Sequence, residues 1–406
     1  MSPMVDATSG AATTTWRSLS PAQTVNRMTP YLPALGVTRV ADVTGLDGVG
    51  IPLVMVVRPN SRSLSITQGK GVTLDAARAS GIMEAVEQHH AETARSVEVA
   101  TLDSLHADDV IDVQRLPRFL RELQRNERIP WVRGHDLERC PIWVPFEMVH
   151  LDLRLPLPPG SGCFLAGSNG LASGNDELEA VLHGAYEVVE RDALTLFYRT
   201  DGPAQWQRRI CLSTIDDPTC AELLQRYDRA RVSVAVWDVT SDVGVATFLC
   251  AIIDRDPNPF RPLGEARGSG AHADRGVALA RALTEAAQSR MTHIVGCRDD
   301  LATTALQENR DPKAIALSRA RIAMAEQPPR SFRDVSHQTH GVGAAIEALK
   351  ARLAQVGVGP IAVVDLSRPE YPAWVVRVIV PGLEAFNQMP GYQPGPRAMR
   401  LGLACA

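Results

Sequence analysis

Short apolar runs recur along this chain, and each one predicts a buried strand. They are bounded by proline, asparagine or glycine, which is typical of strands rather than of buried helices. Two of the runs, at 232–240 and 245–254, follow each other closely enough to form a hairpin. Hairpin-like pairs favour a mixed sheet over a doubly wound parallel one, so we expect a mixed α/β fold. Further strands are expected at 37–46, 51–60, 61–67, 140–149, 361–366 and 374–383.

Polar and charged stretches separate these runs and predict helices. The helical patterns cover 101–128, 310–333 and 343–356. Residues 1 to about 24 are rich in Ser, Thr and Ala, so we expect them to be disordered or loosely attached. No shift in composition marks a convincing boundary in the rest. We therefore divide the chain into an N-terminal segment, 1–59, whose later part packs on the core, and one domain, 60–406.

The first of three related stretches combines a glycine-rich turn with a helix of unusual polarity. Thr73 or Asp75 stands where the helix N-cap belongs. Ser80, Glu84 and Glu87 then follow at helical spacing, so their oxygens share one face. Their neighbours are apolar, and two carboxylates that repel each other on such a helix need a partner. A hard cation bound through oxygen ligands would supply it.

Two later stretches repeat this pattern. The three begin at Gly69, Ser168 and Gly268, and in each a glycine-rich loop leads into a helix. Each later helix also carries polar residues at i, i+3 spacing, with an arginine close by. These positions are Glu187, Glu190, Arg191, Glu285, Gln288 and Arg290. We expect the three loop-plus-helix units to converge on one polyanion and its metal ions.

Each of these features also has a purely structural explanation. A glycine-rich loop is often only a turn. The first one is not a P-loop, because Leu64 stands where that motif needs glycine and Gly71 follows the lysine. A Glu-x-x-Glu pair often lies on a solvated helix face. That explanation is weak for Glu187 and Glu190, because a charge among apolar neighbours is normally paired or metal-bound.

The sequence identifies no catalytic side chain. The histidines, His183 among them, show no metal-binding spacing and are expected to be structural or at the surface. Cys163 is a weak candidate for a nucleophile, because it has no activating neighbour in the sequence. Nothing resembles the G-x-S-x-G motif of a hydrolase nucleophile.

Composition narrows the class of protein. With 406 residues and 45% apolar content, the chain can build an ample core. Its formal net charge of -4, without a basic stripe, argues against nucleic-acid binding. No run of about 18 apolar residues and no secretory signal is present, so we expect no membrane span and a cytoplasmic protein. Seven cysteines without a C-x-x-C pair do not suggest a disulfide framework.

Taken together, three motifs resemble the ATP-binding signature of the YcaO family. One runs S-x-x-x-E-x-x-E from Ser80, one runs N-x-x-x-E-x-x-x-x-x-x-x-E-x-x-E-R from Asn175, and one runs E-x-x-Q-x-R from Glu285. They occur in the family's order, and the likeness covers about 60–385. Stretches upstream of the first helix, and P-G-L-E at 381–384, resemble the branch encoded beside TfuA-like proteins.

The resemblance implies a YcaO-like fold of mixed sheets flanked by helices, and an enzyme that uses ATP to O-phosphorylate a backbone amide of a peptide. A Cys, Ser or Thr side chain would then give an azoline, and external sulfide would give a thioamide. By resemblance, the ligands of Mg²⁺ are Glu84, Glu87, Glu187 and Glu190. The residues expected around ATP are Ser80, Asn175, Glu179, Arg191, Glu285 and Gln288, with Lys70, Arg290 and Arg39 as further candidates for its phosphates.

The C-terminus departs from one pattern of the family. Azoline-forming members commonly end in a proline-rich tail, whereas here Pro390, Pro394 and Pro396 lie well before the end. This favours thioamide formation, with a peptide or protein substrate, a sulfur donor and a TfuA-like partner protein; the family commonly forms homodimers. An azoline cyclodehydratase is the alternative within the same chemistry. From another class, the chain could be a non-catalytic accessory subunit that binds ATP or peptide and supports sulfur insertion.

Overall fold

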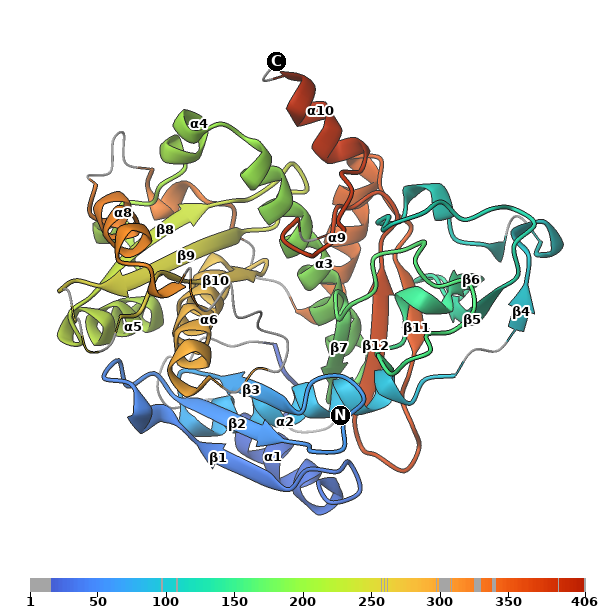
Figure 1. The fold of residues 1–406 in the computed structure, drawn as a ribbon, viewed down its shortest axis with the longest axis horizontal. Helices are drawn as coiled ribbons and strands as arrows, with labels where there is room; N and C mark the ends of the chain where they lie inside the picture. Colours follow the sequence, from blue (N-terminus) through green and yellow to red (C-terminus); the bar gives the residue numbers. More distant parts are fainter. Residues whose placement is uncertain are drawn as a thin grey trace, which may run out of the picture.

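The strands of the protein form three β-sheets, and a long helix packs on each of them (Figure 1). The computed structural model describes residues 16–404, except 96–97, 107–108, 257, 259, 261, 297, 299–306, 308, 325–329, 338–340 and 386. Within these residues every ladder between named strands is antiparallel. The mixed α/β class expected from the sequence is confirmed.

The first sheet joins the predicted N-terminal segment to the predicted domain. Its order is β1 (Arg39–Asp42), β2 (Leu53–Val57) and β3 (Ile66–Lys70), and α2 (Leu74–Glu92) packs against β2 and β3. The side chain of Thr73 accepts a hydrogen bond from the backbone at Ala76 and caps this helix, as expected. Because β2 pairs with both β1 and β3, a division at 59/60 would separate strands of one sheet. That division stays a prediction.

The second sheet contains the predicted hairpin. It consists of β8 (Val232–Asp238), β9 (Thr247–Asp254) and β10 (Ala266–Ala271), in the order β10-β9-β8. Every residue of β9 except the last is buried, which explains its continuous apolar run. Helix α6 (Arg275–Val295) covers this sheet, and the largest cluster of buried apolar residues lies between them.

The third sheet has the order β4-β5-β11-β12-β7, with β6 paired to β5. Its strands are β4 (Glu98–Ala100), β5 (Ile129–His135), β6 (Pro141–Pro145), β7 (Leu171–Gly174), β11 (Ala362–Asp365) and β12 (Trp374–Ile379). Helix α3 (Glu177–Arg199) packs on β7 and β12. Further helices in the described part of the chain are α1 (Pro21–Met28), α4 (Gly202–Gln207), α5 (Pro218–Arg229), α8 (Pro312–Ala323), α9 (Val342–Gln355) and α10 (Pro396–Ala404).

The three glycine-rich stretches are strands rather than loops, which corrects the sequence interpretation. Gly69 lies in β3, the second stretch contributes β7, and Gly268 and Gly270 lie in β10. A Cβ atom at Gly69 would lie within 2.3 Å of the backbone nitrogen of Gly81 in α2. One at Gly268 would lie 2.2 Å from the backbone nitrogen of Ala286 in α6. Glycine is needed here because each helix packs directly on the strand before it.

Two further expectations are wrong in part. The polar stretch 101–128 forms 3₁₀ turns, Leu102–Ser104 and Val113–Arg115, and irregular segments instead of a helix. The side chains of Thr101 and Asp112 cap these turns, a local hydrogen bonding that competes with helix formation. In the described part of 310–333, α8 ends at Ala323 and the 3₁₀ turn Phe332–Asp334 follows later, so the stretch is not one continuous helix.

The expectation that the chain is loosely attached up to about residue 24 is wrong for residues 16–24. Helix α1 begins at Pro21, after an N-cap at Ser20 that forms a complete capping box with Gln23. The rest of the predicted loose segment lies outside the described residues. No helix in the described part of the chain is long and apolar enough to cross a membrane.

Candidate functional site

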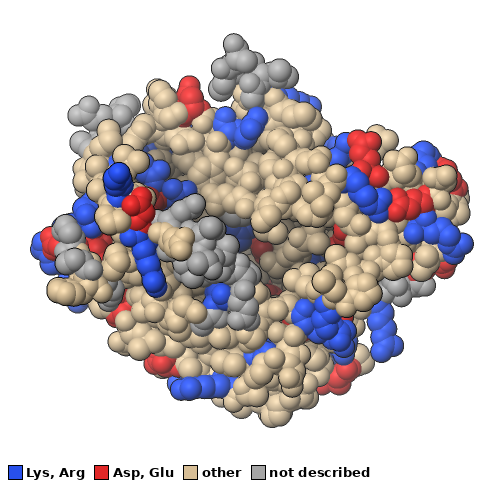
Figure 2. All heavy atoms as spheres, viewed as in Figure 1, with Lys and Arg blue, Asp and Glu red and all other residues tan. Residues whose placement is uncertain are grey.

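Helices α2, α3 and α6 bring five glutamates to one centre. We call Glu84, Glu87, Glu187, Glu190 and Glu285 the carboxylate centre. The negative charge of Glu84 raises the pKa of Glu87, and the negative charges of Glu187 and Glu285 raise the pKa of Glu84. Figure 2 shows the face above these helices hollowed at its middle, with acidic atoms in the depth. The convergence of the three predicted units is therefore a feature of the structure.

Three of these carboxylates have too little positive charge around them to offset the cost of burial. Burial raises the pKa of Glu84 to about 7, although Lys70 opposes the rise. Burial likewise raises the pKa of Glu87 to about 8, although Ser173 donates a hydrogen bond of 2.7 Å to it. Burial and the neighbouring Glu190 raise the pKa of Glu187 to about 7. A cation bound among them would remove this penalty.

The other two members of the centre have partners within the protein. Glu190 accepts hydrogen bonds from the Ser269 hydroxyl at 2.6 Å and from the Ala271 backbone nitrogen at 3.0 Å. Glu285 forms an ion pair with Lys70. Burial alone would raise the pKa of Glu285, but Lys70 and Arg191 lower it to about 2. The centre thus combines carboxylates fixed by the protein with carboxylates that remain available.

The arrangement of the carboxylates fits Mg²⁺ only when oxygen atoms of a bound ligand complete its coordination. Among the described residues, no three His, Cys, Asp or Glu side chains lie close enough to hold a metal ion by themselves. Mg²⁺ in nucleotide sites is usually bound through one or two carboxylates together with phosphate oxygens and water. Glu84, Glu87 and Glu187 offer such carboxylates. Glu187 keeps 20% of its side chain exposed, so solvent and ligand can reach it.

Basic groups border the carboxylate centre and could receive phosphate oxygens. Arg191 lies 3.9 Å from Glu187 and 3.7 Å from Glu190. Arg281, one turn before Glu285 on α6, places both terminal nitrogens 3.3 Å from Nε2 of His183. A guanidinium has only donors, so Nε2 is the acceptor and the imidazole is neutral. Burial and Arg281 accordingly lower the pKa of His183 well below its usual value.

The N-terminal end of α3 forms a second, compensated part of the site. Oδ1 of Asn175 accepts a hydrogen bond of 3.1 Å from Thr24, and the Asn175 backbone nitrogen donates to Glu179 at 3.0 Å. Glu179 also accepts hydrogen bonds from Ser18 and Arg17. Burial alone would raise the pKa of Glu179, yet these donors lower it.

The predicted site residues fall into two groups. Lys70, Asn175, Glu179 and Arg191 lie in the site as described. Gln288 borders the centre and donates to the backbone oxygen of Gln68 on β3. Ser80 lies on α2, half-buried, one turn before Glu84.

Two further candidates lie apart from the others. Arg290 is bound to Asp47 and Asp254, each at 2.9 Å, and only 3% of its side chain is exposed. Arg39 is exposed at the first residue of β1. The structure gives no geometric support for a phosphate contact by either one, and their roles stay predictions.

Sequence reasoning missed several residues that the structure adds to the site. Arg17 and Thr24 belong to the segment expected to be loose, so nothing singled them out. Arg377 offered a signal, because it is a lone charge within the apolar strand β12; it is 1% exposed, and its charge acts on Glu187 and Glu87. His183 was expected to be structural or at the surface, whereas it faces Arg281 beside the centre.

Cys163 shows no sign of activation. Burial raises the pKa of its thiol to about 11, so little thiolate forms near neutral pH. The five cysteines in the described part of the chain are all free.

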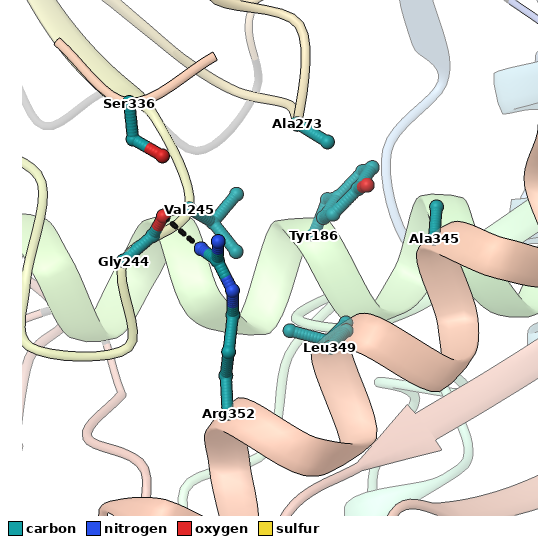
Figure 3. A pocket seen from close by; sticks show the side chains of 8 residues that line it. All are labelled: Tyr186, Gly244, Val245, Ala273, Ser336, Ala345, Leu349 and Arg352. Carbon is teal, nitrogen blue, oxygen red and sulfur yellow. Dashed lines mark hydrogen bonds between the residues drawn. The ribbon is translucent and has the colours of Figure 1, made fainter. Parts of the chain in front are cut away.

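A cavity of different character also borders α3 (Figure 3). The space between its walls is about 240 Å³, including part open to solvent, and Tyr186 of α3 faces Leu349 and Arg352 of α9 across it. Arg352 is the one charged group among its lining residues, and its guanidinium donates to the backbone oxygen of Gly244. The cavity therefore offers little to a polyanion, and we expect the nucleotide at the carboxylate centre instead.

Fold and site together fit an α/β protein that binds a nucleotide and a metal ion, with acidic residues from three helices at its centre. The family model described as "YcaO cyclodehydratase, ATP-ad Mg2+-binding" matches residues 68–384. The chain belongs to the YcaO family. ATP and Mg²⁺ are the cofactors of this family, and the membership that the three motifs suggested is confirmed; the roles of the motif residues stay predictions.

Curated relatives and solved structures agree with this assignment. An uncharacterised protein in the tfuA 3′ region of Rhizobium leguminosarum bv. trifolii is 37% identical, over 94% of this chain and 92% of its own. An uncharacterised protein of Methanothermobacter thermautotrophicus is 33% identical, over 92% and 96% of the two chains.

Two solved structures share the fold at low sequence identity. YcaO from Methanopyrus kandleri bound with AMPPCP and Mg²⁺ has a TM-score of 0.71 at 23% identity, over 94% of this chain and 96% of that one. A heterocyclase in complex with substrate and cofactor has a TM-score of 0.73 at 23% identity. This chain is covered to 91% in that comparison but spans only 53% of the heterocyclase chain.

Proposed function

We propose that the protein uses ATP to activate a backbone amide of a peptide or protein and that the product is a thioamide. The observation that carries the proposal is the set of three carboxylates, Glu84, Glu87 and Glu187, whose pKa values burial raises to about 7 or 8. A scaffold has no need to hold like charges together out of water. Transfer of a phosphoryl group needs positioning and charge neutralisation more than covalent help.

Residues along α3 would provide this positioning and charge neutralisation. Asn175 and Glu179, with Arg17 and Thr24 beside them, lie at its N-terminal end and would hold the nucleoside part of ATP. Glu187 and Glu190 follow two to three turns later, opposite the carboxylates of α2, and would share Mg²⁺ with the phosphates. When bound, ATP supplies the phosphoryl group that turns an amide oxygen into a leaving group.

Basic residues around the centre would neutralise charge that develops on the phosphates. Arg191 and Arg281 come from different helices and approach the centre from two sides. Lys70 already pairs with Glu285 and would hold that carboxylate ionised while it faces the nucleotide. Ser80 and Gln288, at the edges of the centre, would complete the contacts with ATP.

Two observations favour a thioamide over an azoline. One relative lies in the tfuA 3′ region, which suggests that a TfuA-like partner acts with this enzyme. Pro396 begins α10, and the next residue, Arg397, is bound to Asp192 of α3. Pro396 is thus part of a helix attached to α3, and not of an extended proline-rich segment. A sulfur donor and a homodimeric state complete the proposal.

Mass spectrometry separates the two products. The protein is incubated with a TfuA-like partner, Mg-ATP, sulfide and peptides encoded near its gene. A thioamide raises the mass of a peptide by the difference between sulfur and oxygen, whereas an azoline lowers it by one water. Loss of water without any need for sulfide would overturn the thioamide proposal and support the cyclodehydratase alternative.

An accessory subunit of another enzyme is the competing function from a different class. It would bind ATP or peptide without turning ATP over. Release of phosphate that requires Mg²⁺, peptide and an intact Glu187 would exclude this alternative. ATP-independent modification of the peptide would contradict both enzymatic proposals.

A further inference from the structure

An aromatic pocket lies at the C-terminal end of α3, beyond the carboxylate centre. We define it by six lining residues: Phe197, Tyr198, Trp206, Trp237, Arg267 and Arg321. They come from α3, α4, β8, β10 and α8, and the empty space between them is about 400 Å³, including part open to solvent. None of these residues belongs to the predicted nucleotide or metal site.

The pocket is built by contacts that fix its walls. The side-chain nitrogen of Gln205 donates to the backbone oxygens of Phe197 and Thr200, which sets the turn between α3 and α4. The guanidinium of Arg209 lies 5.6 Å from the ring centres of both Trp206 and Trp237. The two indole rings are therefore held in place before any ligand arrives, which lowers the entropy lost on binding.

Guanidinium groups border the aromatic walls. Arg267 donates to the hydroxyl of Tyr198 at 3.3 Å and to Glu265 at 2.6 Å, and Arg321 also donates to Glu265. Both arginine side chains keep 39% of their surface exposed, whereas Glu265 keeps 7%. The cationic edges thus face the opening while the carboxylate lies behind them. Aromatic faces with cations beside them recognise an aromatic ring through stacking and cation–π contact.

The pocket continues the functional face of α3. Glu187, Glu190 and Arg191 are followed by Tyr198 at spacings that keep them near one side of the helix. From Glu190 to Tyr198 the helix rises about 12 Å. On β10, Arg267 is two residues, or about 7 Å, from Ser269, whose hydroxyl binds Glu190. The pocket therefore opens within about 7–12 Å of the carboxylate centre, away from Asn175 and Glu179.

An extended peptide covers about 3.3–3.6 Å per residue, so two to four residues span this distance. We propose that the aromatic pocket binds an aromatic side chain of the peptide substrate, two to four residues from the amide that is activated. This inference rests on the proposed function, because it takes the carboxylate centre as the place of phosphoryl transfer. The nucleotide would occupy one end of α3 and the side chain of the substrate the other.

Binding of short peptides to the full-length protein tests this pocket. The probes are acetylated and amidated hexaglycine peptides whose third residue is Phe, Leu or Ala. Dissociation constants are measured by calorimetry with Mg²⁺ and a non-hydrolysable ATP analogue present. The Phe peptide is expected to bind at least about tenfold more tightly than the Ala peptide, with Leu between them, because only the aromatic ring can stack and contact the cations.

Variants then locate the binding. Trp206→Ala is expected to weaken the Phe peptide at least about tenfold, and Trp206→Phe, which keeps an aromatic face, by less than about threefold. Trp143→Ala is the matched control, because Trp143 is also half-buried beneath an arginine, with Arg133 at 4.7 Å, but lies on β6 in another sheet. Unchanged affinity in Trp206→Ala, or equal losses in Trp206→Ala and Trp143→Ala, would overturn the assignment.

The unmutated protein separates this inference from the proposed function. If it binds the nucleotide analogue but shows no preference for Phe over Ala, the aromatic pocket is wrong and the ATP site stands. If it fails to bind the nucleotide analogue with Mg²⁺, the proposed function is wrong. A preference for Leu over Phe would also contradict the inference, because apolar volume alone would then explain binding.

Discussion

Helix α3 carries two buried acidic sites whose carboxylates are treated in opposite ways. In the carboxylate centre, the cation closest to Glu187 is Arg191, 3.9 Å away. Five residues later, Asp192 is completely buried and accepts three hydrogen bonds of 2.9 Å, two from Arg397 and one from the Glu384 backbone. We call Asp192, Glu384 and Arg397 the tail lock, because they attach α10 to α3.

The comparison shows how a carboxylate with a structural role differs from one that remains available to a ligand. In the tail lock, Glu384 accepts from the hydroxyl of Tyr392 and from the backbone of Gly395 and Ala398, so its oxygens are also satisfied. A buried charge with such partners stabilises a contact between segments. The carboxylates of the centre have too few donors for their number, which is expected where a metal ion and phosphates bind.

The largest expected effect comes from removing one carboxylate of the centre. Glu187→Gln, and likewise Glu84→Gln, should lower Mg-ATP turnover at least about 100-fold, because a ligand of the metal is lost. Thermal stability without ligand should be unchanged or higher, because like charges no longer repel each other. Calorimetry with Mg-ATP and thermal unfolding check both parts. Glu177→Gln is the control, because Glu177 lies on the same helix but pairs with Arg139; wild-type affinity in Glu187→Gln would contradict the assignment.

Breaking the tail lock should lower the stability of the protein, whereas removing a carboxylate of the centre should not. Arg397→Ala leaves Asp192 buried without its cation and should lower the free energy of unfolding by about 3 kcal/mol. Arg400→Ala, on the exposed side of α10, should change it by less than about 0.5 kcal/mol. Urea unfolding measures both variants. Equal effects of the two substitutions would show that the tail lock does not hold α10.

The change of the free energy of unfolding with pH should reveal the raised pKa values of the carboxylate centre. Glu84, Glu87 and Glu187 have pKa values of about 7, 8 and 7 in the folded protein, above the 4.5 of an unfolded chain. The folded state therefore holds more protons, and the free energy of unfolding falls as pH rises through this range.

Buried histidines have lowered pKa values and act in the other direction, but only below their unfolded value of 6.5. The decline should therefore be clearest between pH 6.5 and about 8, in protein without ligand. It should be smaller in Glu87→Gln and absent with excess Mg²⁺ and nucleotide. Stability that rises over this window would contradict the raised pKa values.

The smallest expected effect is that of a thiol reductant. The described cysteines are free, and both acidic sites are held by non-covalent contacts. The urea midpoint should be the same with and without reductant. A midpoint that falls clearly on addition of the reductant would show a disulfide that stabilises the fold.

Local patterns in the sequence account for much of the fold. The apolar runs at 51–60, 232–240 and 245–254 contain β2, β8 and β9, because a buried strand needs a short run of apolar side chains and little else. The expected N-cap at Thr73 and the helix from 343 to 356 are also confirmed, because capping and helical periodicity likewise depend on residues close together in the sequence. The sequence was least informative at 101–128, where side chains that cap short turns resemble the polar face of a helix.

The glycines show a different limit of sequence reasoning. Gly69 and Gly268 were interpreted as parts of loops, because glycine is common in turns. Their reason lies in the close approach of α2 and α6, which the sequence does not display. Arg17 and Thr24 are a similar case, because their segment is weakly patterned and their partners, Glu179 and Asn175, lie far away in the sequence.

The sequence by itself determined which carboxylates share a helix face, because that depends only on a spacing of three or four residues. The tertiary structure alone decided which of them would be neutralised. Lys70 pairs with Glu285 across 215 positions, and Arg397 pairs with Asp192 across 205. Ion pairs between such distant residues exist only after the sheets and helices have packed. The charge of Glu84, Glu87 and Glu187 that these pairs leave incompletely neutralised is the part that we expect a metal ion to use.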